Sequence, residues 1–146
     1  RTMSKWAGLA GLRVGYGIMN GDLAKILLKV KPPYNVNQAA EAALLASLED
    51  VQALQERVNL LIRERNVMSL QLGKINGVQP WPSEANFILC QLEPGTGLKT
   101  YKGLAEQGVF VRYFSDPRLT DFIRVSVGKP EDTARLIDAL HHGKIA

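Results

Sequence analysis

The spacing of apolar residues gives the chain a glycine-broken first segment followed by helices and strands. Residues 9–19 are apolar and interrupted by glycine, a pattern that predicts a strand after a tight turn. Asp22 is suited to cap a short helix that runs to about Val30, and the prolines of Lys31-Pro32-Pro33 end it. These prolines mark the expected boundary between two domains, residues 1–35 and 36–146.

Helical periodicity continues over residues 38–72. Asn37 is a candidate cap for a helix over residues 38–48, and Asp50 begins a long helix to about Leu72. The long helix has an apolar stripe made of Val51, Leu54, Val58, Leu61, Ile62, Met68 and Leu72. Its charged side chains, Glu56, Arg57, Arg63, Glu64 and Arg65, are expected to form a solvated face.

The remaining residues change to the shorter period of strands. Strands are predicted at 85–92, 109–114 and 122–127, with helices at 98–107 and 131–142. In the last strand, alternation places Arg124 on one face with Phe122 and Ser126, and places the aliphatic residues on the other face. This order of elements predicts a small α+β domain in which helices cover a sheet.

Composition excludes several classes of protein. The chain has 146 residues and a net charge of +4, and its cations are scattered among acids, which argues against nucleic-acid binding. No apolar stretch is long enough to cross a membrane. The single cysteine, Cys90, lies in an apolar run and is expected to be a buried structural thiol. With one cysteine and two adjacent histidines, metal-ligand spacing is missing.

The first residues carry the chemistry that is most informative. Lys5 and Arg13 flank a glycine-rich turn, Thr2 and Ser4 lie close by, and the first 21 residues hold no Asp or Glu. A lysine amine forms an imine with a carbonyl, while arginine and hydroxyl groups bind a phosphate dianion. The segment therefore suits a phosphorylated carbonyl cofactor. A dinucleotide site at Gly15–Gly21 is disfavoured, because one residue too many separates its second and third glycines.

Two further arginines are candidates for binding an anionic substrate. Arg124 is flanked by apolar residues in its predicted strand, a setting that suits a bidentate carboxylate site. The alternative for Arg124 is a salt bridge to Glu131 or Asp132. Arg112 shares a predicted strand face with aromatic residues, and its alternative is a surface salt bridge.

The segment Ser4-Lys5-x-x-Gly-Leu-Ala-Gly-Leu-Arg13-x-Gly-Tyr16 closely resembles the cofactor-lysine segment of fold-type I pyridoxal-phosphate aminotransferases, most of all their histidinol-phosphate branch. Further matches are residues 29–36, 82–89 and 122–131. The resemblance implies an α/β fold-type I chain, here the end of the large cofactor-binding domain plus the α+β C-terminal small domain. It also implies that the chain is the C-terminal part of a longer enzyme.

The same resemblance assigns roles to the candidate residues. Lys5 would form the imine with pyridoxal 5'-phosphate and then act as general base, and Thr2, Ser4 and Arg13 would hold the cofactor phosphate. Arg124 and Arg112 would bind the substrate. The implied substrates are L-histidinol phosphate and 2-oxoglutarate or glutamate, in a homodimer located in the cytoplasm or, in a photosynthetic eukaryote, in the plastid stroma.

Three other interpretations remain open. The pattern is shared in large part by aminotransferases that act on aromatic amino acids and by those of the cobalamin pathway. The lysine segment alone also fits a pyridoxal-phosphate lyase. A non-catalytic remnant or interaction module is the third, because the remaining cofactor contacts of such enzymes are expected upstream of Arg1, and without them the isolated chain is expected to be inactive.

Overall fold

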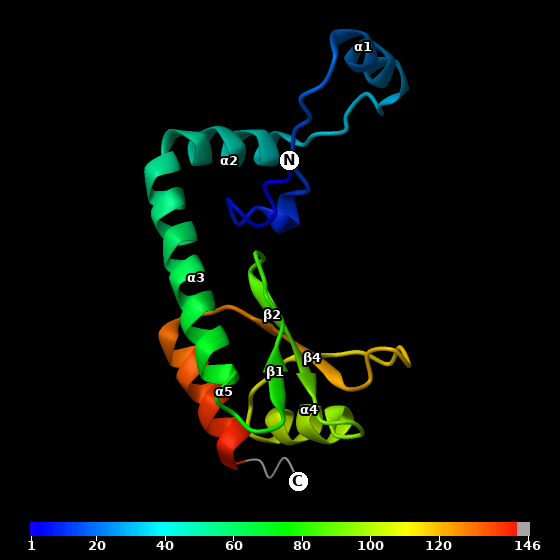
Figure 1. The fold of residues 1–146 in the computed structure, drawn as a ribbon. Coiled ribbons are helices and arrows are strands. Elements are labelled where there is room, and N and C mark those ends of the chain that lie inside the picture. The colour runs from blue at the N-terminus through cyan, green and yellow to red at the C-terminus, as the bar shows by residue number, and fades with distance from the viewer. Residues whose placement is uncertain (143–146) are drawn as a thin grey trace. The chain divides into compact units, whose positions relative to one another are not determined.

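The computed structural model describes residues 1–142, and the chain divides into two compact units, Arg1–Val58 and Asn59–Ala146. The first unit contains the 3-10 turn η1 (Ala10–Leu12) and the helices α1 (Gly21–Val30) and α2 (Gln38–Glu49). Helix α3 (Val51–Leu72) begins in the first unit and ends in the second (Figure 1). The domain boundary expected after residue 35 stays a prediction.

The second unit contains the sheet and its covering helices. Its strands are β1 (Val78–Pro80), β2 (Phe87–Leu92), β3 (Arg112–Tyr113) and β4 (Phe122–Ser126), and its helices are α4 (Gly97–Glu106) and α5 (Pro130–His142). The strands lie in the order β1-β2-β4-β3, and every neighbouring pair is antiparallel. This arrangement confirms the expected sheet with covering helices.

The predicted helices are confirmed to within about a turn, and α1 and α2 each begin with a side-chain cap. Asn37 accepts a hydrogen bond from the backbone N–H of Ala40 at 2.8 Å, as expected for the cap of α2. Helix α1 is capped by Asn20, whose side chain accepts from the N–H of Asp22 at 2.8 Å, rather than by Asp22 itself. The extended backbone of Lys31 before Pro32 ends this helix.

The strand predicted over residues 9–19 is wrong. Residues 10–12 form the turn η1, and Arg13 has a left-handed φ of +55°. A strand needs a continuous hydrogen-bonded neighbour, but the only ladder contact here is an isolated antiparallel bridge between Thr2 and Gly15. The strand predicted at residues 109–114 is likewise reduced to Arg112–Tyr113, the only two residues of that stretch that pair with β4.

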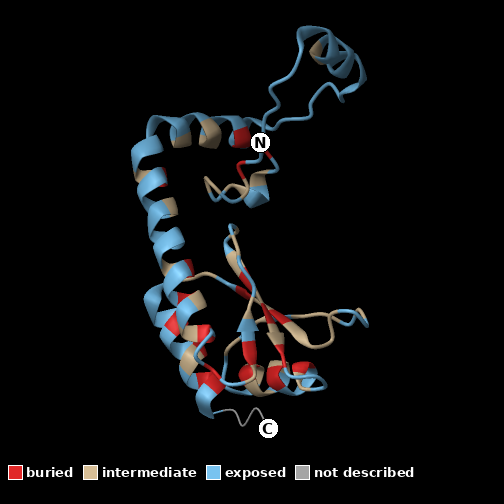
Figure 2. Ribbon diagram, in the orientation of Figure 1, coloured by how far each residue is buried: buried red, intermediate tan, exposed pale blue. Residues whose placement is uncertain are grey.

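The sheet has one buried face and one face that is half exposed. Ile88, Cys90, Ile123 and Val125 are buried together with Met68 of α3 and other residues of the helices (Figure 2). The opposite side, called here the open face, carries Phe87, Leu89, Phe122, Arg124 and Arg112, which are half buried or exposed. The alternation predicted for β4 is therefore confirmed, with Arg124 away from the core.

Candidate functional site

Thr2, Ser4, Lys5 and Arg13 belong to one compact loop, residues 1–16. The loop is closed by the bridge between Thr2 and Gly15 and by the N–H of Met3, which donates to the carbonyl of Val14 at 3.2 Å. Gly15 permits this close approach, because a Cβ at that position would lie 2.5 Å from the carbonyl oxygen of Arg1. The buried side chains of Met3 and Val14 pack with Ala40 of α2, so the loop has a small core of its own.

The two predicted hydroxyl residues are brought together directly. Thr2 Oγ1 donates to Ser4 Oγ at 2.8 Å and accepts from the backbone N–H of Ser4 at 3.1 Å. This leaves the Ser4 hydroxyl hydrogen available to donate to a ligand. Lys5 follows immediately and is exposed, at the start of the turn in which Gly8 N–H donates to the Lys5 carbonyl.

Arg13 lies in the same loop but not in the setting that was expected. It follows η1 in an exposed position, and its Nη1 donates to the carbonyl of Ala10 at 2.8 Å. Arg13 is therefore exposed to solvent in a turn, and does not lie in the strand predicted over residues 9–19. Within residues 1–142 no ion pair of Arg13 is found, so its remaining guanidinium N–H groups are available to an anion.

The loop presents groups that can bind a phosphate such as that of pyridoxal phosphate. It offers two adjacent hydroxyl groups and the cations Lys5 and Arg13, and the first 21 residues contain no carboxylate side chain that would repel an anion. Among the four predicted residues, only Thr2 and Ser4 are joined to each other by a hydrogen bond in the described structure. The case for a phosphate site therefore depends on the hydrogen-bond donors that the loop presents, and not on contacts among the four residues.

The Nε of Arg124 lacks a hydrogen-bond acceptor among the described residues. Its Cζ lies 5.0 Å from the centroid of the Phe87 ring, and its Nε is buried with no hydrogen-bond partner among the described residues. Among the described residues Arg124 forms no salt bridge to Glu131 or Asp132, the alternative partners, and Asp132 accepts from the N–H of Lys129 at 2.9 Å. A buried N–H donor is expected to have a partner, so this atom points to a ligand acceptor.

Arg112 lies directly opposite Arg124, as its Cα partner on the neighbouring strand. Its Cζ is 5.9 Å from the centroid of the Phe114 ring, which confirms that Arg112 shares a face with this aromatic residue. Neither arginine forms an ion pair within the part of the chain that the structure describes. The open face thus presents two guanidinium groups suited to an anion.

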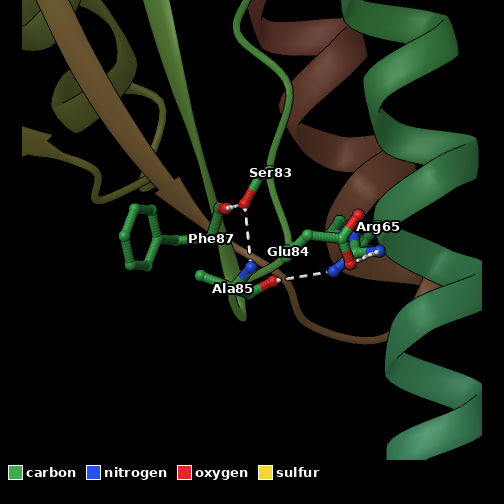
Figure 3. Close-up of polar contacts among 5 residues, drawn as sticks. All are labelled: Arg65, Ser83, Glu84, Ala85 and Phe87. Atoms are coloured by element: carbon green, nitrogen blue, oxygen red, sulfur yellow. Dashed lines mark hydrogen bonds and ion pairs between the residues drawn. The ribbon is translucent and has the colours of Figure 1, made fainter.

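The role of Arg65 was not predicted from the sequence. It was assigned to the solvated face of the long helix, but only 8% of its surface is exposed. The signal that could have identified it is its spacing, because Arg65 stands three residues before Met68 and seven before Leu72, on the helical face that enters the core. Figure 3 shows its side chain reaching toward Glu84 and Ala85, just before β2.

Comparison with known proteins places the chain in a family. The model of aminotransferase class I and II matches residues 1–140. A histidinol-phosphate aminotransferase of Roseiflexus castenholzii is 44% identical over 143 residues, covering 96% of this chain and 38% of that protein. A chloroplastic histidinol-phosphate aminotransferase of Nicotiana tabacum is 43% identical over 143 residues, covering 97% of this chain and 35% of the relative.

A solved structure supports the same assignment. The histidinol-phosphate aminotransferase of Sinorhizobium meliloti, in complex with pyridoxal-5'-phosphate, superposes with a TM-score of 0.79 at 26% identity, covering 96% of this chain and 39% of that one. The match confirms the predicted α/β fold class. The chain spans about 38% of the length of the Roseiflexus relative. With a family model matched over residues 1–140, the chain belongs to the class I and II aminotransferases.

Proposed function

We propose that this chain is part of a pyridoxal-phosphate-dependent aminotransferase that acts on L-histidinol phosphate. The reaction transfers the amino group of L-histidinol phosphate to 2-oxoglutarate. The products are imidazole-acetol phosphate and glutamate. The observation that carries the proposal is 44% identity, over 96% of the chain, to a relative bearing that name. Because the chain spans only part of that relative, the activity belongs to the longer protein.

Loop 1–16 would hold the cofactor. When bound, pyridoxal phosphate supplies an aldehyde carbon for amines and a ring that withdraws electrons. Lys5 Nζ is the nucleophile for that aldehyde, and Ser4 and Arg13 are the direct donors for the phosphate. Thr2 donates its hydroxyl hydrogen to Ser4 and would help to hold the phosphate by orienting the Ser4 hydroxyl. Once displaced by the substrate amine, Lys5 Nζ would serve as the base that moves the proton of the substrate carbon.

The open face would hold the substrate. Arg124 has a buried Nε that lacks an acceptor, and Arg112 stands opposite on β3. Two guanidinium groups match a phosphate dianion, which accepts several charge-assisted hydrogen bonds, as well as the carboxylates of glutamate. This arrangement favours a substrate that carries a phosphate over one with an apolar aromatic side chain.

The assembly and location follow the same proposal. The longer enzyme would be a homodimer, located in the cytoplasm or, if the source is photosynthetic, in the plastid stroma. Among residues 1–142, no helix is long and apolar enough to cross a membrane.

The deciding experiment is a transamination assay of the longest native polypeptide that contains this chain. With pyridoxal phosphate present, glutamate formation from L-histidinol phosphate should exceed that from L-tyrosine or L-phenylalanine. Equal or greater turnover of the aromatic amino acids would reassign the substrate to the aromatic branch. A protein that retains no cofactor and shows no turnover would favour the non-catalytic alternative.

A further inference from the structure

A buried arginine outside the proposed site holds the segment that enters β2. Arg65 of α3 is 8% exposed, and its guanidinium has two contacts on neighbouring residues (Figure 3). Nη1 donates to the carbonyl of Ala85 at 3.5 Å, and Nη2 donates to Glu84 Oε2 at 3.3 Å. The planar fork of one arginine thus contacts two consecutive residues.

The held segment is a tight turn with its own hydrogen bonds. Ser83 Oγ accepts from the N–H of Ala85 at 3.1 Å and donates to the carbonyl of Phe87 at 2.5 Å. On the far side, the N–H of Val127, just after β4, donates to the carbonyl of Asn86 at 2.9 Å. The turn therefore connects α3 with the ends of β2 and β4.

The end of this turn carries the ring that flanks Arg124. Phe87 is the first residue of β2, and its ring centroid lies 5.0 Å from Arg124 Cζ. A guanidinium at this distance is attracted to the negative face of the ring, which limits the rotamers it adopts. The path from Arg65 through the turn to Phe87 and Arg124 lies entirely within the unit Asn59–Ala146.

A contribution to stability does not by itself explain why a buried arginine stands at position 65. Its carboxylate partner has a side chain that is 97% exposed, and an ion pair with a solvated acid contributes little free energy. A buried arginine loses hydration, and a well-packed apolar side chain of similar size often stabilises a fold as much or more. What methionine or leucine could not supply is the pair of directed hydrogen bonds to Glu84 and Ala85.

We propose that Arg65 is a positioning residue for the substrate site. It fixes the turn at residues 83–87 so that the Phe87 ring holds the Arg124 guanidinium in its binding orientation. The inference deepens the proposed function and rests on it for the role of Arg124. The geometric part, from Arg65 to the Phe87–Arg124 pair, is measurable without any substrate.

The experiment uses the longest native polypeptide that contains this chain, with arginine labelled by nitrogen-15. Because the Phe87 ring lies beside the Arg124 guanidinium, its ring current changes the chemical shift of the Arg124 Nε–Hε resonance. The variant Phe87→Leu, which lacks the ring, gives the size of that change. Arg65→Met and Arg65→Lys are then compared with Arg63→Met, a matched control at an exposed position of α3. Ser83→Ala tests the turn independently if the Arg65 variants fail to fold.

Arg65→Met, Arg65→Lys and Ser83→Ala are each expected to move the Arg124 resonance toward its position in Phe87→Leu, with the resonances of the remaining arginines retained. Arg63→Met should leave it in place. Inorganic phosphate, titrated as a probe, should bind at Arg124 about three- to tenfold more weakly in Arg65→Met, as for loss of preorganisation. An unchanged Arg124 resonance in folded Arg65 variants, or in Ser83→Ala if those do not fold, would overturn the positioning role.

The two proposals fail in different ways. If the Arg124 resonance moves in the Arg65 variants but phosphate and substrate never perturb it in the native protein, positioning is upheld and the substrate role of Arg124 is wrong. If substrate perturbs Arg124 and the Arg65 variants do not, the substrate role is upheld and the positioning role is wrong.

Discussion

Arg112 of β3 and Arg124 of β4 are directly opposite each other in the antiparallel ladder, on the open face of the sheet. Like charges in this position repel and disfavour the strand pair. Each guanidinium has an aromatic ring nearby, at 5.9 Å from Phe114 for Arg112 and at 5.0 Å from Phe87 for Arg124. The rings offset part of the repulsion, and a bound anion would remove the remainder.

Replacing Arg124 by methionine should weaken substrate use without unfolding the protein. The variant loses charge-assisted hydrogen bonds worth about 1.5–3 kcal/mol, so kcat/KM for L-histidinol phosphate should fall by roughly 10- to 150-fold. Removal of the repulsion with Arg112 should leave thermal stability unchanged or slightly higher. Steady-state kinetics and a thermal melt measure both effects.

Arg118→Met is the matched control for Arg124→Met. Arg118 lies in the loop that joins β3 to β4, where it is exposed and pairs with Asp116 at 3.0 Å, so its loss should leave kcat/KM near the native value. Equal losses in the two variants would show a general effect of positive charge, and the assignment of Arg124 to the substrate would then be abandoned.

Lys5→Ala should abolish covalent retention of pyridoxal phosphate and all turnover, because the ε-amine is the proposed nucleophile. The expected readout is loss of the near-ultraviolet absorption of the bound cofactor, together with loss of the covalent label that borohydride reduction leaves on residue 5. Lys29→Ala removes an exposed lysine of α1 and should change neither. A borohydride label on any other lysine contradicts the assignment.

Gly15→Ala should disrupt loop 1–16. The added Cβ would lie 2.5 Å from the Arg1 carbonyl oxygen and 3.2 Å from Thr2 Cα, so the backbone must move, at a cost of about 1–3 kcal/mol. Displacement of Thr2 should lower cofactor affinity as well as stability. Gly11→Ala is the control, since nothing lies within 4 Å of its Cβ position. If Gly15→Ala binds cofactor as well as Gly11→Ala does, the closed loop is not needed for the site.

Local signals explain which parts of this fold were predictable. Asn37 caps α2 through a neighbour three residues away, and the alternation in β4 puts Arg124 opposite the core, so both could be recognised within a short window. The conformation of the segment around Arg13 could not be recognised in this way, because its apolar pattern is typical of a strand. Among the described residues its one strand-like pairing is the bridge between Thr2 and Gly15. Propensity was overridden by the lack of a continuous neighbouring strand.

The residues of the candidate site also differ in how far they could be predicted from local sequence. Lys5, Thr2 and Ser4 could be proposed as site residues because they lie close together in the sequence, and the structure joins the two hydroxyl groups. Arg65 depends on Glu84 and Ala85, which lie about twenty residues further along the chain. A contact over that separation leaves only the helical spacing of Arg65 as a clue, and charged residues are seldom fully buried unless paired.

Cys90 gives a test of the core that is independent of the site. It was expected to be a buried thiol, and it is 0% exposed; burial raises its pKa from 9.0 to about 12. The folded protein therefore keeps the proton that the unfolded chain releases above pH 9.0. Since the unfolded state then binds fewer protons, the free energy of unfolding falls as pH rises between these two values, by at most about 1.4 kcal/mol per pH unit.

Cys90→Ala isolates this contribution, because the two proteins differ only at this thiol. Chemical denaturation of the native protein and of the variant at pH of about 8 to 11 should show a steeper loss of stability in the native protein, whatever their stabilities at neutral pH. The thiol should also react with an alkylating reagent only as fast as the protein opens. Parallel pH profiles together with rapid alkylation of the folded protein would place Cys90 in contact with solvent, and the packing of β2 against its helices would need to be reassigned.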